Sequence, residues 1–302
     1  MSKINLDSQI YQFNTQFLGI SSYTSSTVVC MQNNLLHGGI FSTNNFLSED
    51  YLLNFCGNSS YLGRRMGVSH FYSEGGLATI TKRSLDENTE QATILPKPTK
   101  IRTSISQAII NRRSIRDYKL TKMSQKDLSN LLFYACGVSK KESKEVDFFP
   151  EPMDFKLRNS PSAGGIYPIK LYFRCNNVAG LDNGIYVYYP ETHAVKLVKA
   201  EKESCDCKNY ADFATIKAQE VNLIFFYVYD MYVNTRKYGN IGAAFAFIEA
   251  GEMAQNIQLV STALGYGACD IGGYNKPLVE RELDLDGITK HLIHVTIVGS
   301  EE

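Results

Sequence analysis

Two apolar stretches that nearly adjoin decide the fold: N-L-I-F-F-Y-V-Y, Asn222 to Tyr229, and I-G-A-A-F-A-F-I-E-A-G-E-M-A-Q-N-I-Q-L-V-S-T-A-L, Ile241 to Leu264. The first is apolar without alternation, which is typical of a strand covered on both faces. The second is apolar nearly all round, which predicts a long buried helix, and Gly265 is expected to end it. Both elements therefore belong to the centre of the protein.

Further strands are predicted around this centre. Ile169–Cys175 alternates like a half-buried strand, and Leu292–Gly299 supplies a last strand. Two runs on either side of Pro190, Ile185–Tyr189 and Ala194–Val198, predict a hairpin. Strands and helices mix without a regular β-α-β alternation. The sequence therefore predicts an α+β fold in which helices pack on a mainly antiparallel sheet.

A helix is predicted to start at Ser104, because Ser104 and Gln107 have capping-box spacing. Its residues Ile105, Ala108 and Ile109 form one stripe, which we expect to face inward. The same stripe runs on into a group of arginines.

The remaining segments set the domain boundaries. Ser124–Cys136 predicts a second helix, with Ser124 as N-cap and Gly137 as its stop, and Lys140–Pro152 is expected to be a charged loop. Residues 82–102 are polar and contain two prolines, which interrupt helix and sheet pairing. The predicted organisation is an N-terminal extension of unassigned fold over residues 1–81, a linker over 82–102 and the main domain over 103–302.

The composition is that of an ordinary globular protein of 302 residues, 44% of them hydrophobic and 21% charged. Lys plus Arg and Asp plus Glu both number 31, so no global field attracts nucleic acid or an anionic membrane. No run approaches the roughly 20 apolar residues of a membrane helix, and the N-terminus lacks a secretory signal, so we expect a cytoplasmic protein. The seven scattered cysteines suit reduced thiols, and Cys205 with Cys207 is expected to lie in a solvated loop rather than at a metal.

The arginines lie in R-R-S-I-R-D-Y, Arg112–Tyr118. Arginine is always charged and its planar fork suits phosphate, so this segment is a candidate anion clamp. The alternative is a solvated basic helix end that complements the helix dipole. The candidate binding residues are Arg112, Arg113, Ser114 and Arg116.

A second candidate is S-P-S-A-G-G-I-Y-P, Ser160–Pro168, which places small residues between two prolines just before a predicted strand. Small residues let backbone N–H groups approach a ligand, and the prolines stiffen the frame. The alternative is a plain tight turn. The candidate lining residues are Pro161, Ser162, Ala163, Gly164 and Gly165.

A third candidate is T-R-K-Y-G-N, Thr235–Asn240, between the covered strand and the buried helix. A lysine and a tyrosine side by side can trade protons once burial or a neighbouring cation lowers their pKa values, and Arg236 is adjacent. Lys237 and Tyr238 are therefore candidate acid–base residues. The alternative is two surface residues in a loop.

A second turn of bare backbone, Gly272 and Gly273, follows the long helix. Two glycine-lined turns and one arginine clamp suit a flat aromatic cofactor that carries a phosphate. The glycine-rich phosphate loops of P-loop NTPases and Rossmann dehydrogenases are absent from the sequence, which excludes both classes. His291 and His294 fall on opposite faces of the last strand, so no metal site is expected.

These segments, in this order, resemble the flavin-dependent nitroreductase superfamily, whose signature is R-R-S-x-R followed by an aromatic residue. More narrowly, P-S-A-G-G-I-Y-P, R-K-Y-G and E-A-G-E-M-A-Q-N…L-G-Y-G-A-C-D-I-G-G-Y are similar to the SagB-type azoline dehydrogenases of thiazole/oxazole-modified peptide biosynthesis. The resemblance covers about residues 100–300. The N-terminal third resembles the variable extension of that family only loosely.

The resemblance implies a homodimer with FMN and the long helix at its interface. The R-R-S-x-R residues would face the phosphate and ribityl chain, both glycine turns the ring, and Lys237 and Tyr238 would match the catalytic pair. It also implies FMN-dependent oxidation of thiazoline or oxazoline rings in a ribosomally made precursor peptide, beside a cyclodehydratase of the YcaO type. The alternatives are an NAD(P)H-dependent nitro or enone reductase, and a scaffold subunit that keeps flavin only to hold its fold.

Overall fold

The computed structural model describes residues 51–52, 87–145, 150–200, 210, 216 and 220–302 of the 302-residue chain. The predicted N-terminal extension apart from Tyr51 and Leu52, and the pair Cys205 and Cys207, lie outside the described residues. All strands of the main sheet that pair along their length do so antiparallel, as predicted.

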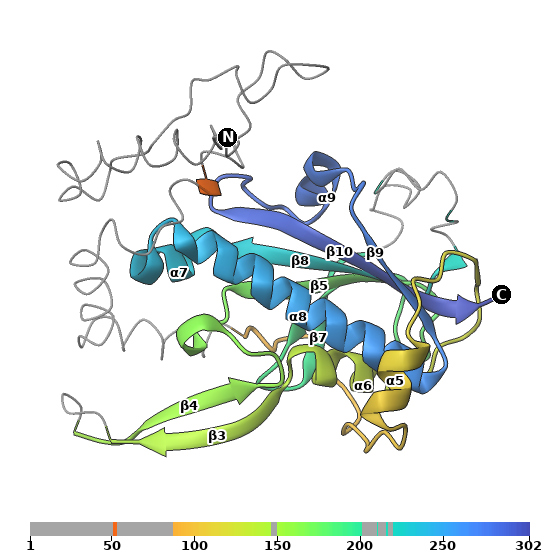
Figure 1. Ribbon diagram of the computed structural model, residues 1–302, viewed down its shortest axis with the longest axis horizontal. Coiled ribbons are helices and arrows are strands. Elements are labelled where there is room, and N and C mark those ends of the chain that lie inside the picture. The colour runs from red at the N-terminus through yellow and green to blue at the C-terminus, as the bar shows by residue number, and fades with distance from the viewer. Residues whose placement is uncertain (1–50, 53–86, 146–149, 201–209, 211–215, 217–219) are drawn as a thin grey trace, which may run out of the picture.

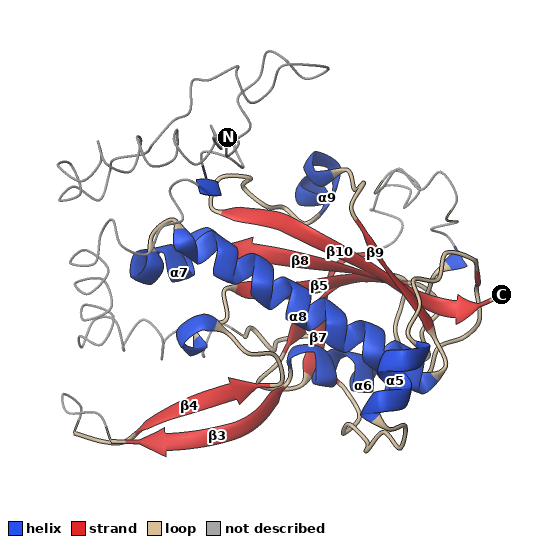
Figure 2. Cartoon of the chain, viewed as in Figure 1, coloured by secondary structure: helices blue, strands red, loops and turns tan. Residues whose placement is uncertain are grey.

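The main sheet has the strand order β1-β7-β6-β5-β8-β10-β2, and β9 also pairs with β10. Consecutive strands β5, β6 and β7 form a meander, and β8 and β10 extend it on the other side (Figures 1 and 2). The bounds are β1 (Thr93–Ile94), β2 (Tyr118–Lys119), β5 (Ile169–Cys175), β6 (Gly184–Tyr189), β7 (Ala194–Ala200), β8 (Leu223–Asp230), β9 (Gly267–Ile271) and β10 (Lys290–Glu301).

Helices cover both faces of this sheet. α8 crosses one face, with α5 and α6 beside its C-terminal half (Figure 1), and α9 packs on the other face. None of the helices in the described part of the chain is long and apolar enough to span a membrane. The bounds are α5 (Ile105–Asn111), α6 (Gln125–Cys136), α7 (Met231–Tyr238), α8 (Ile241–Leu264) and α9 (Lys276–Glu282).

The uniform apolar character of β8 follows from its central position. Leu223, Phe225 and Tyr227 belong to the core beneath α6 and α8. Residues between them, such as Ile224 and Phe226, belong to the core on the α9 side. Alternate side chains enter two different cores, so every position is apolar. The predicted covered strand is confirmed.

The predicted helix ends are also confirmed. The Ser104 hydroxyl accepts the Gln107 N–H at 3.2 Å, and the Ser124 hydroxyl accepts the Asp127 N–H at 3.0 Å. Each bond satisfies a backbone donor that the first turn of a helix leaves without an intrahelical partner. α8 ends at Gly265, whose φ of +83° is a left-handed conformation that glycine adopts at least cost.

The inward stripe predicted for α5 is wrong in the single chain. Ala108 is buried, but Ile105 is 74% exposed and Ile109 54% exposed. α8 is likewise only partly buried, because Phe247 and Ile248 are each 56% exposed. The two-turn helix α5 meets α8 along one side only, so its remaining apolar side chains face solvent.

The charged loop predicted over Lys140–Pro152 is wrong in its first part. Residues 140–144 belong to strand β3 (Val138–Lys144), which pairs with β4 (Met153–Arg158) in a two-stranded ribbon where Glu142 lies opposite Phe155, whereas residues 145 and 150–152 are outside both strands. The ribbon projects away from the main sheet (Figure 1), so neither strand needs the apolar alternation that would have revealed it. β4 ends two residues before Ser160.

The segment predicted as a linker is packed where it is described. Thr93–Ile94 adds an edge strand to β7 just before the prolines, and Leu95 is buried. The carbonyl of Pro96 accepts the Ser129 hydroxyl at 2.5 Å, and the Thr99 N–H donates to Asn130 at 2.8 Å. The domain boundary itself stays a prediction.

Candidate active site

Lys237 and Tyr238 end α7, the short helix between β8 and α8. Asn234 ties this helix to both neighbours, because it accepts the Tyr229 hydroxyl of β8 and donates to the Gly242 carbonyl of α8, each at 2.7 Å. Gly239 closes α7 by donating its N–H to the Thr235 carbonyl. The helix that carries the candidate acid–base pair is thus fixed at both ends.

The turn Pro161–Gly165 and the Lys237–Tyr238 pair meet at Gly164. A Cβ atom built on Gly164 would lie 2.5 Å from Lys237 Nζ and 2.5 Å from the Tyr238 hydroxyl. Gly164 also has φ +65°, which a side chain would strain. A side chain at position 164 would therefore have to displace the ends of Lys237 and Tyr238, and the structure brings these predicted site residues together.

Burial controls the chemistry of the pair. Lys237 is 5% exposed, and this desolvation lowers the pKa of its ammonium group. Its Nζ lies 5.2 Å from the centre of the Tyr238 ring, which packs edge-to-face on Phe245. The predicted repulsion from Arg236 concerns a side chain outside the described residues, so burial alone accounts for the direction here. Burial therefore favours the neutral amine of Lys237.

The described part of the N-terminal extension reaches the same place. The Tyr51 hydroxyl donates to the Asn240 carbonyl at 3.2 Å and accepts the Ala244 N–H at 2.9 Å. It thereby satisfies a backbone donor in the first turn of α8, where the Asn240 side chain forms no cap. No local pattern in residues 1–81 had indicated this contact.

The arginine segment lies against β9. Ser114 pairs with Ala268 in a parallel bridge, and the Ile115 N–H donates to the Ala268 carbonyl at 3.1 Å. Because side chains alternate along extended backbone, residues 112, 114 and 116 share one side and residue 113 takes the other. The pKa of Cys269, which burial raises, is held back by the charges of Arg116 and Arg112 and by a hydrogen bond to Ser114.

Arg113 is separated from this group. Its Nη1 donates to the carbonyls of Ile110 at 2.8 Å and Arg112 at 2.7 Å. Its side chain lines a pocket of about 470 Å³ at the end of α8, together with Lys119 and Tyr266. In the sequence analysis, Arg112, Arg113, Ser114 and Arg116 were treated as one helix end. Had the segment been predicted as extended, the alternation of side chains would have indicated that Arg113 lies on the opposite side from the other three.

A partly buried chain of polar side chains holds Arg112. Its Nη1 donates to Gln258 Oε1 of α8 at 3.2 Å, and Gln258 Nε2 donates to Asp270 at 2.5 Å. Asp270 also accepts the Thr296 hydroxyl at 2.6 Å, and His294 lies 3.2 Å from it. These bonds outweigh the effect of burial and lower the pKa of Asp270. The Arg112 side chain is therefore held in one orientation by a hydrogen bond to α8, whereas the Arg116 side chain is exposed.

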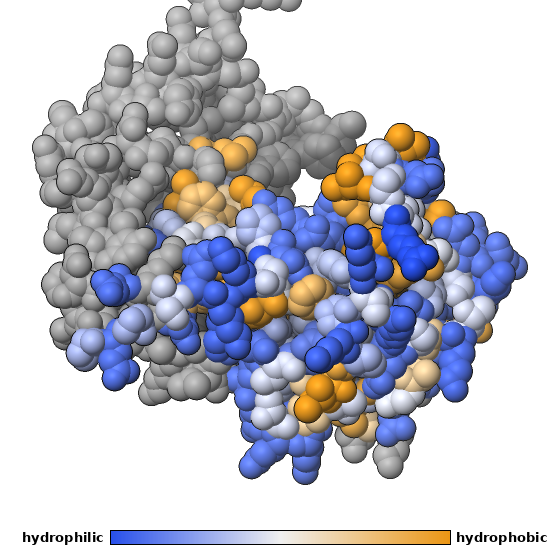
Figure 3. All heavy atoms as spheres, turned by 90° about the horizontal axis from the view of Figure 1, so that it is seen from below, coloured by the Kyte–Doolittle hydropathy of each residue, from blue (hydrophilic) through white to orange (hydrophobic). Residues whose placement is uncertain are grey.

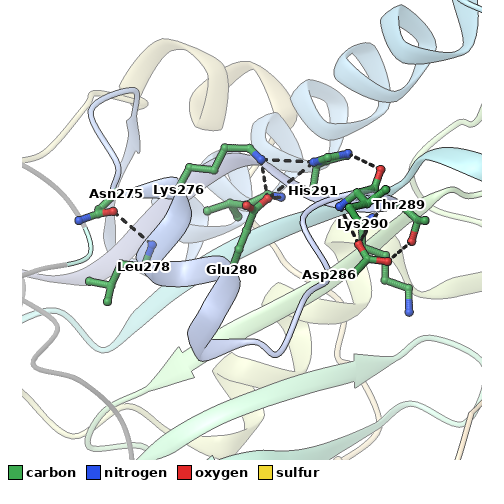
Figure 4. A network of polar contacts seen from close by, with 10 residues as sticks. Asn275, Lys276, Leu278, Glu280, Asp286, Thr289, Lys290 and His291 are labelled. Carbon is green, nitrogen blue, oxygen red and sulfur yellow. Dashed lines mark hydrogen bonds and ion pairs between the residues drawn. The ribbon is translucent and has the colours of Figure 1, made fainter.

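Gly272 and Gly273 follow β9 directly and are exposed. A Cβ atom on either would meet no atom within 4 Å, so the backbone there is open. The next helix, α9, is anchored by Asn275, which accepts the Leu278 N–H, and by Lys276, which bonds Glu280 at 2.5 Å (Figure 4). Gly272 and Gly273 therefore lie between β9 and a helix whose first turn is stabilised by side-chain bonds.

The predicted residues thus lie in groups along α8 and β9. Glu249, which touches the Pro161–Gly165 turn, and Gln258, which holds Arg112, are nine positions apart on α8, or about 14 Å at 1.5 Å per residue. Gly272 lies four positions beyond Ala268 on β9, also about 14 Å at 3.4 Å per residue. Cations stand at one end and open glycine backbone at the other. This arrangement fits a ligand with a phosphate and a flat ring.

Sequence reasoning missed Glu249, which is 2% exposed beneath the turn. The available signal was its charge: Glu249 interrupts the otherwise apolar run that begins at Ile241. In the described residues no group of three or more His, Cys, Asp or Glu side chains could hold a metal ion.

Residues 109–300 match the sequence profile of the nitroreductase family. Over 171 residues the chain is 29% identical to a protein of Methanocaldococcus jannaschii that is named as a nitroreductase, a match that covers 56% of this chain and 79% of that one.

Solved structures share the fold. One is a protein of Ralstonia eutropha JMP134 described as a nitroreductase, with a TM-score of 0.57, 22% identity and coverage of 71% of this chain and 91% of that one. Another is a chain of the Escherichia coli microcin synthetase complex McbBCD with truncated pro-MccB17 bound, with a TM-score of 0.51, 20% identity and coverage of 78% and 97%. These likenesses confirm the predicted fold.

Proposed function

The chain belongs to the nitroreductase family, whose members are flavin-dependent oxidoreductases, and on that premise we propose that it oxidises thiazoline or oxazoline rings in a ribosomally made peptide. The observation that carries the proposal is the packing of Lys237 Nζ and the Tyr238 hydroxyl against Gly164. Ring oxidation requires a base beside the two-electron acceptor, and a buried lysine with a lowered pKa supplies one.

The residues present fit FMN. Arg112, Ser114 and Arg116 would hold the phosphate and ribityl chain. The backbone of Pro161–Gly165, which is open at Gly165, and the open backbone of Gly272–Gly273 would lie along the ring. Arg113 remains a proposed contributor to the charge near the phosphate. When bound, FMN would supply the two-electron acceptor for the hydride from the substrate ring.

The proton transfer falls to the Lys237–Tyr238 pair. An ordinary lysine with a pKa of about 10.4 is almost wholly protonated at neutral pH. Burial raises the fraction of neutral amine at Lys237, which can then take the proton from the ring α-carbon. Tyr238 would relay that proton or orient the ring. Loss of one proton and one hydride per ring yields the aromatic thiazole or oxazole.

Two further observations support a peptide substrate. The motifs P-S-A-G-G-I-Y-P and R-K-Y-G are those that resemble the azoline dehydrogenases, and both lie at the site. The microcin synthetase chain of like fold was solved in a complex with truncated pro-MccB17 bound. A precursor peptide and a cyclodehydratase of the YcaO type are accordingly the proposed partners, in the cytoplasm.

The exposed apolar side chains support a homodimer. Ile105, Ile109 and Ile110 of α5 and Phe247 and Ile248 of α8 are all more than half exposed. Figure 3 shows apolar patches of this kind between hydrophilic residues on one face of the molecule. Groups of exposed large apolar side chains are typical of interaction sites, so a second copy is the proposed cover. Sedimentation showing a monomer that retains flavin would contradict the dimer.

The decisive experiment incubates the purified protein with a heterocyclised peptide and its cyclodehydratase, and follows the peptide by mass spectrometry. Azoline oxidation removes two hydrogens per ring. The relatives named as nitroreductases favour one alternative, an NAD(P)H-dependent nitro or enone reductase. Bleaching of bound flavin by NADPH, with no change in peptide mass, would establish that reductase. A colourless protein that forms the peptide-modifying complex would favour the scaffold.

A further inference from the structure

A carboxyl group lies in the core directly under the glycine turn. Glu249 of α8 is 2% exposed, and its neighbours on that face of the helix, Ala246, Ala250 and Met253, are also buried. Burial of an ionised carboxylate costs several kcal/mol unless it is hydrogen-bonded. A residue retained at such cost, with no part in the acid–base pair itself, calls for a structural or functional reason.

Glu249 joins the two sides of the turn. It accepts hydrogen bonds from the Ser162 hydroxyl, before the glycines, and from the Ile169 N–H, after them. The Ser162 oxygen in turn accepts the Tyr167 N–H at 2.9 Å, and the Ser162 carbonyl accepts the Gly165 N–H. The segment from Ser162 to Ile169 is therefore closed over one side chain of α8.

The backbone of this turn is in a conformation that requires stabilising contacts. Gly164 and Gly165 both have φ +65°, and Tyr167 has φ +53°, so three residues adopt left-handed conformations within a short segment. That conformation costs a non-glycine residue roughly 1–2 kcal/mol, and glycines lose more backbone entropy than other residues when held. The Tyr167 hydroxyl also accepts the Arg158 N–H at 3.0 Å, which secures the outer side.

We propose that Glu249 is a positioning residue of this site, whose ionised carboxylate binds Ser162 and Ile169 and so keeps the Gly164 backbone against Lys237 Nζ and the Tyr238 hydroxyl. It acts through the turn and does not touch the reacting atoms. The inference rests on the proposed function only in that the turn would line the flavin ring.

The groups that face Glu249 determine when it is ionised. Burial raises its pKa to about 7, opposed by the bonds from Ser162 and Ile169 and by Arg158 at the end of β4, while Glu252 of the same helix adds to the rise. Cys136 of α6 also faces it, as a thiol whose pKa burial raises. The carboxylate therefore gains its proton as pH falls through about 7, and the turn loses its charged acceptor.

Global stability runs in the opposite direction. A carboxyl whose pKa is raised in the folded state binds a proton more tightly folded than unfolded, so its contribution is greatest below about pH 4.3 and is lost as pH rises to about 7. Glu249→Gln should therefore leave the protein equally or more stable at pH 8 while it loosens the turn. A merely structural role would lower stability and turn protection together.

The test uses amide hydrogen exchange of the full, ligand-free chain at pH 6 and pH 8, corrected for intrinsic rates. In the native protein, the amides of Gly165, Tyr167 and Ile169, which are hydrogen-bonded in the closed turn, should be protected at pH 8 and less protected at pH 6. In Glu249→Gln, protection at pH 8 should fall on the order of ten- to a hundredfold, the usual worth of hydrogen bonds to a charged group. Glu252→Gln, the matched control on the same helix, should keep the native protection at pH 8 and lose it only at a lower pH, because it removes a charge that adds to the rise of the Glu249 pKa.

A fluorescence titration with FMN at both pH values gives a second readout, with weaker binding expected at pH 6 and in Glu249→Gln at either pH. If Glu249→Gln does not fold, Ser162→Ala removes the same bond from the turn and should reduce protection likewise. Native protection at pH 8 in either folded variant overturns the inference. The exchange pattern needs no flavin or peptide, so a failure of azoline oxidation would leave this result standing.

Discussion

The site residues near the start of α8 and those on the arginine segment near its end differ in how firmly the protein holds them. Lys237 and Glu249 are 5% and 2% exposed, and the acid–base pair packs against the turn at Gly164. On the arginine segment, Arg113, Ser114 and Arg116 are exposed, and Arg112 alone of the arginines is held by the buried Gln258.

The difference in burial suits two different roles, proton transfer for the buried residues and anion binding for the exposed arginines. Proton transfer depends on fixed distances and on low dielectric, which burial provides. An anion can be attracted over a longer range by exposed charges that settle when it arrives. Variants of the Lys237–Tyr238 pair should therefore change rate, and variants of the arginine segment should change affinity.

The largest effect is expected for Lys237→Ala, which should keep flavin and the dimer but lower azoline oxidation on the order of 100- to 10,000-fold. Tyr238→Phe should lose much of the rate for the same reason. In the native protein the rate should rise with pH until the Lys237 pKa, which burial sets below 10.5, is passed. Steady-state kinetics across pH would measure both, and a near-native rate in flavin-loaded Lys237→Ala would remove the proposed base.

A smaller loss, on the order of 100-fold in turnover per bound flavin, is expected for Gly164→Ala, because the new Cβ displaces Lys237 and Tyr238. Gly165→Ala is the matched control: it has the same φ of +65°, but its Cβ would meet nothing within 4 Å. Thermal unfolding should show similar destabilisation of both. Equal turnover in the two would mean that contact at Gly164 is unimportant.

Bulkier changes in the same turn, Ala163→Leu and Gly164→Val, should expel the cofactor at modest cost to folding, because the backbone there is proposed to line the ring. Flavin content after purification measures this directly. Full retention in both variants would show the turn to be merely structural.

Arg116→Ala should weaken FMN binding on the order of ten- to a hundredfold, the worth of a hydrogen bond between charged groups, with turnover of the loaded enzyme little changed. Arg113→Ala should have less effect, since its guanidinium bonds the carbonyls of Ile110 and Arg112 on the other side. Titrations at several salt concentrations would separate the two. Equal losses would mean that both arginines reach the phosphate.

The smallest effect is expected for Gln258→Ala, which frees Arg112 without removing its charge. The lost hydrogen bond comes from a charged guanidinium and is worth about 1.5–3 kcal/mol, but it acts on FMN only through the position of Arg112, so FMN affinity should fall by several-fold. Isothermal titration calorimetry with Arg112→Ala as reference would measure it. If both variants bind FMN as tightly as the native protein, Arg112 does not contact the phosphate.

Local sequence patterns predicted the individual elements well. The sequence correctly predicted the capping residues Ser104 and Ser124, the covered strand β8 and the full extent of α8. These features depend on residues that are close together along the chain, so a short stretch of sequence is enough to indicate them. The ribbon of β3 and β4 was missed for the converse reason: its strands bury too little to need an apolar pattern.

What the sequence by itself determined is therefore the central strands and helices, the ends of those helices and the residue types at the site. Only the tertiary structure decided that Gly164 meets Lys237 and Tyr238, that Arg113 turns away from Arg112, and that Glu249 lies under the turn. Caps and periodicity are set by neighbours along the chain. Contacts between distant segments depend on strand order and on the packing of α8 across the sheet, which no local pattern specifies.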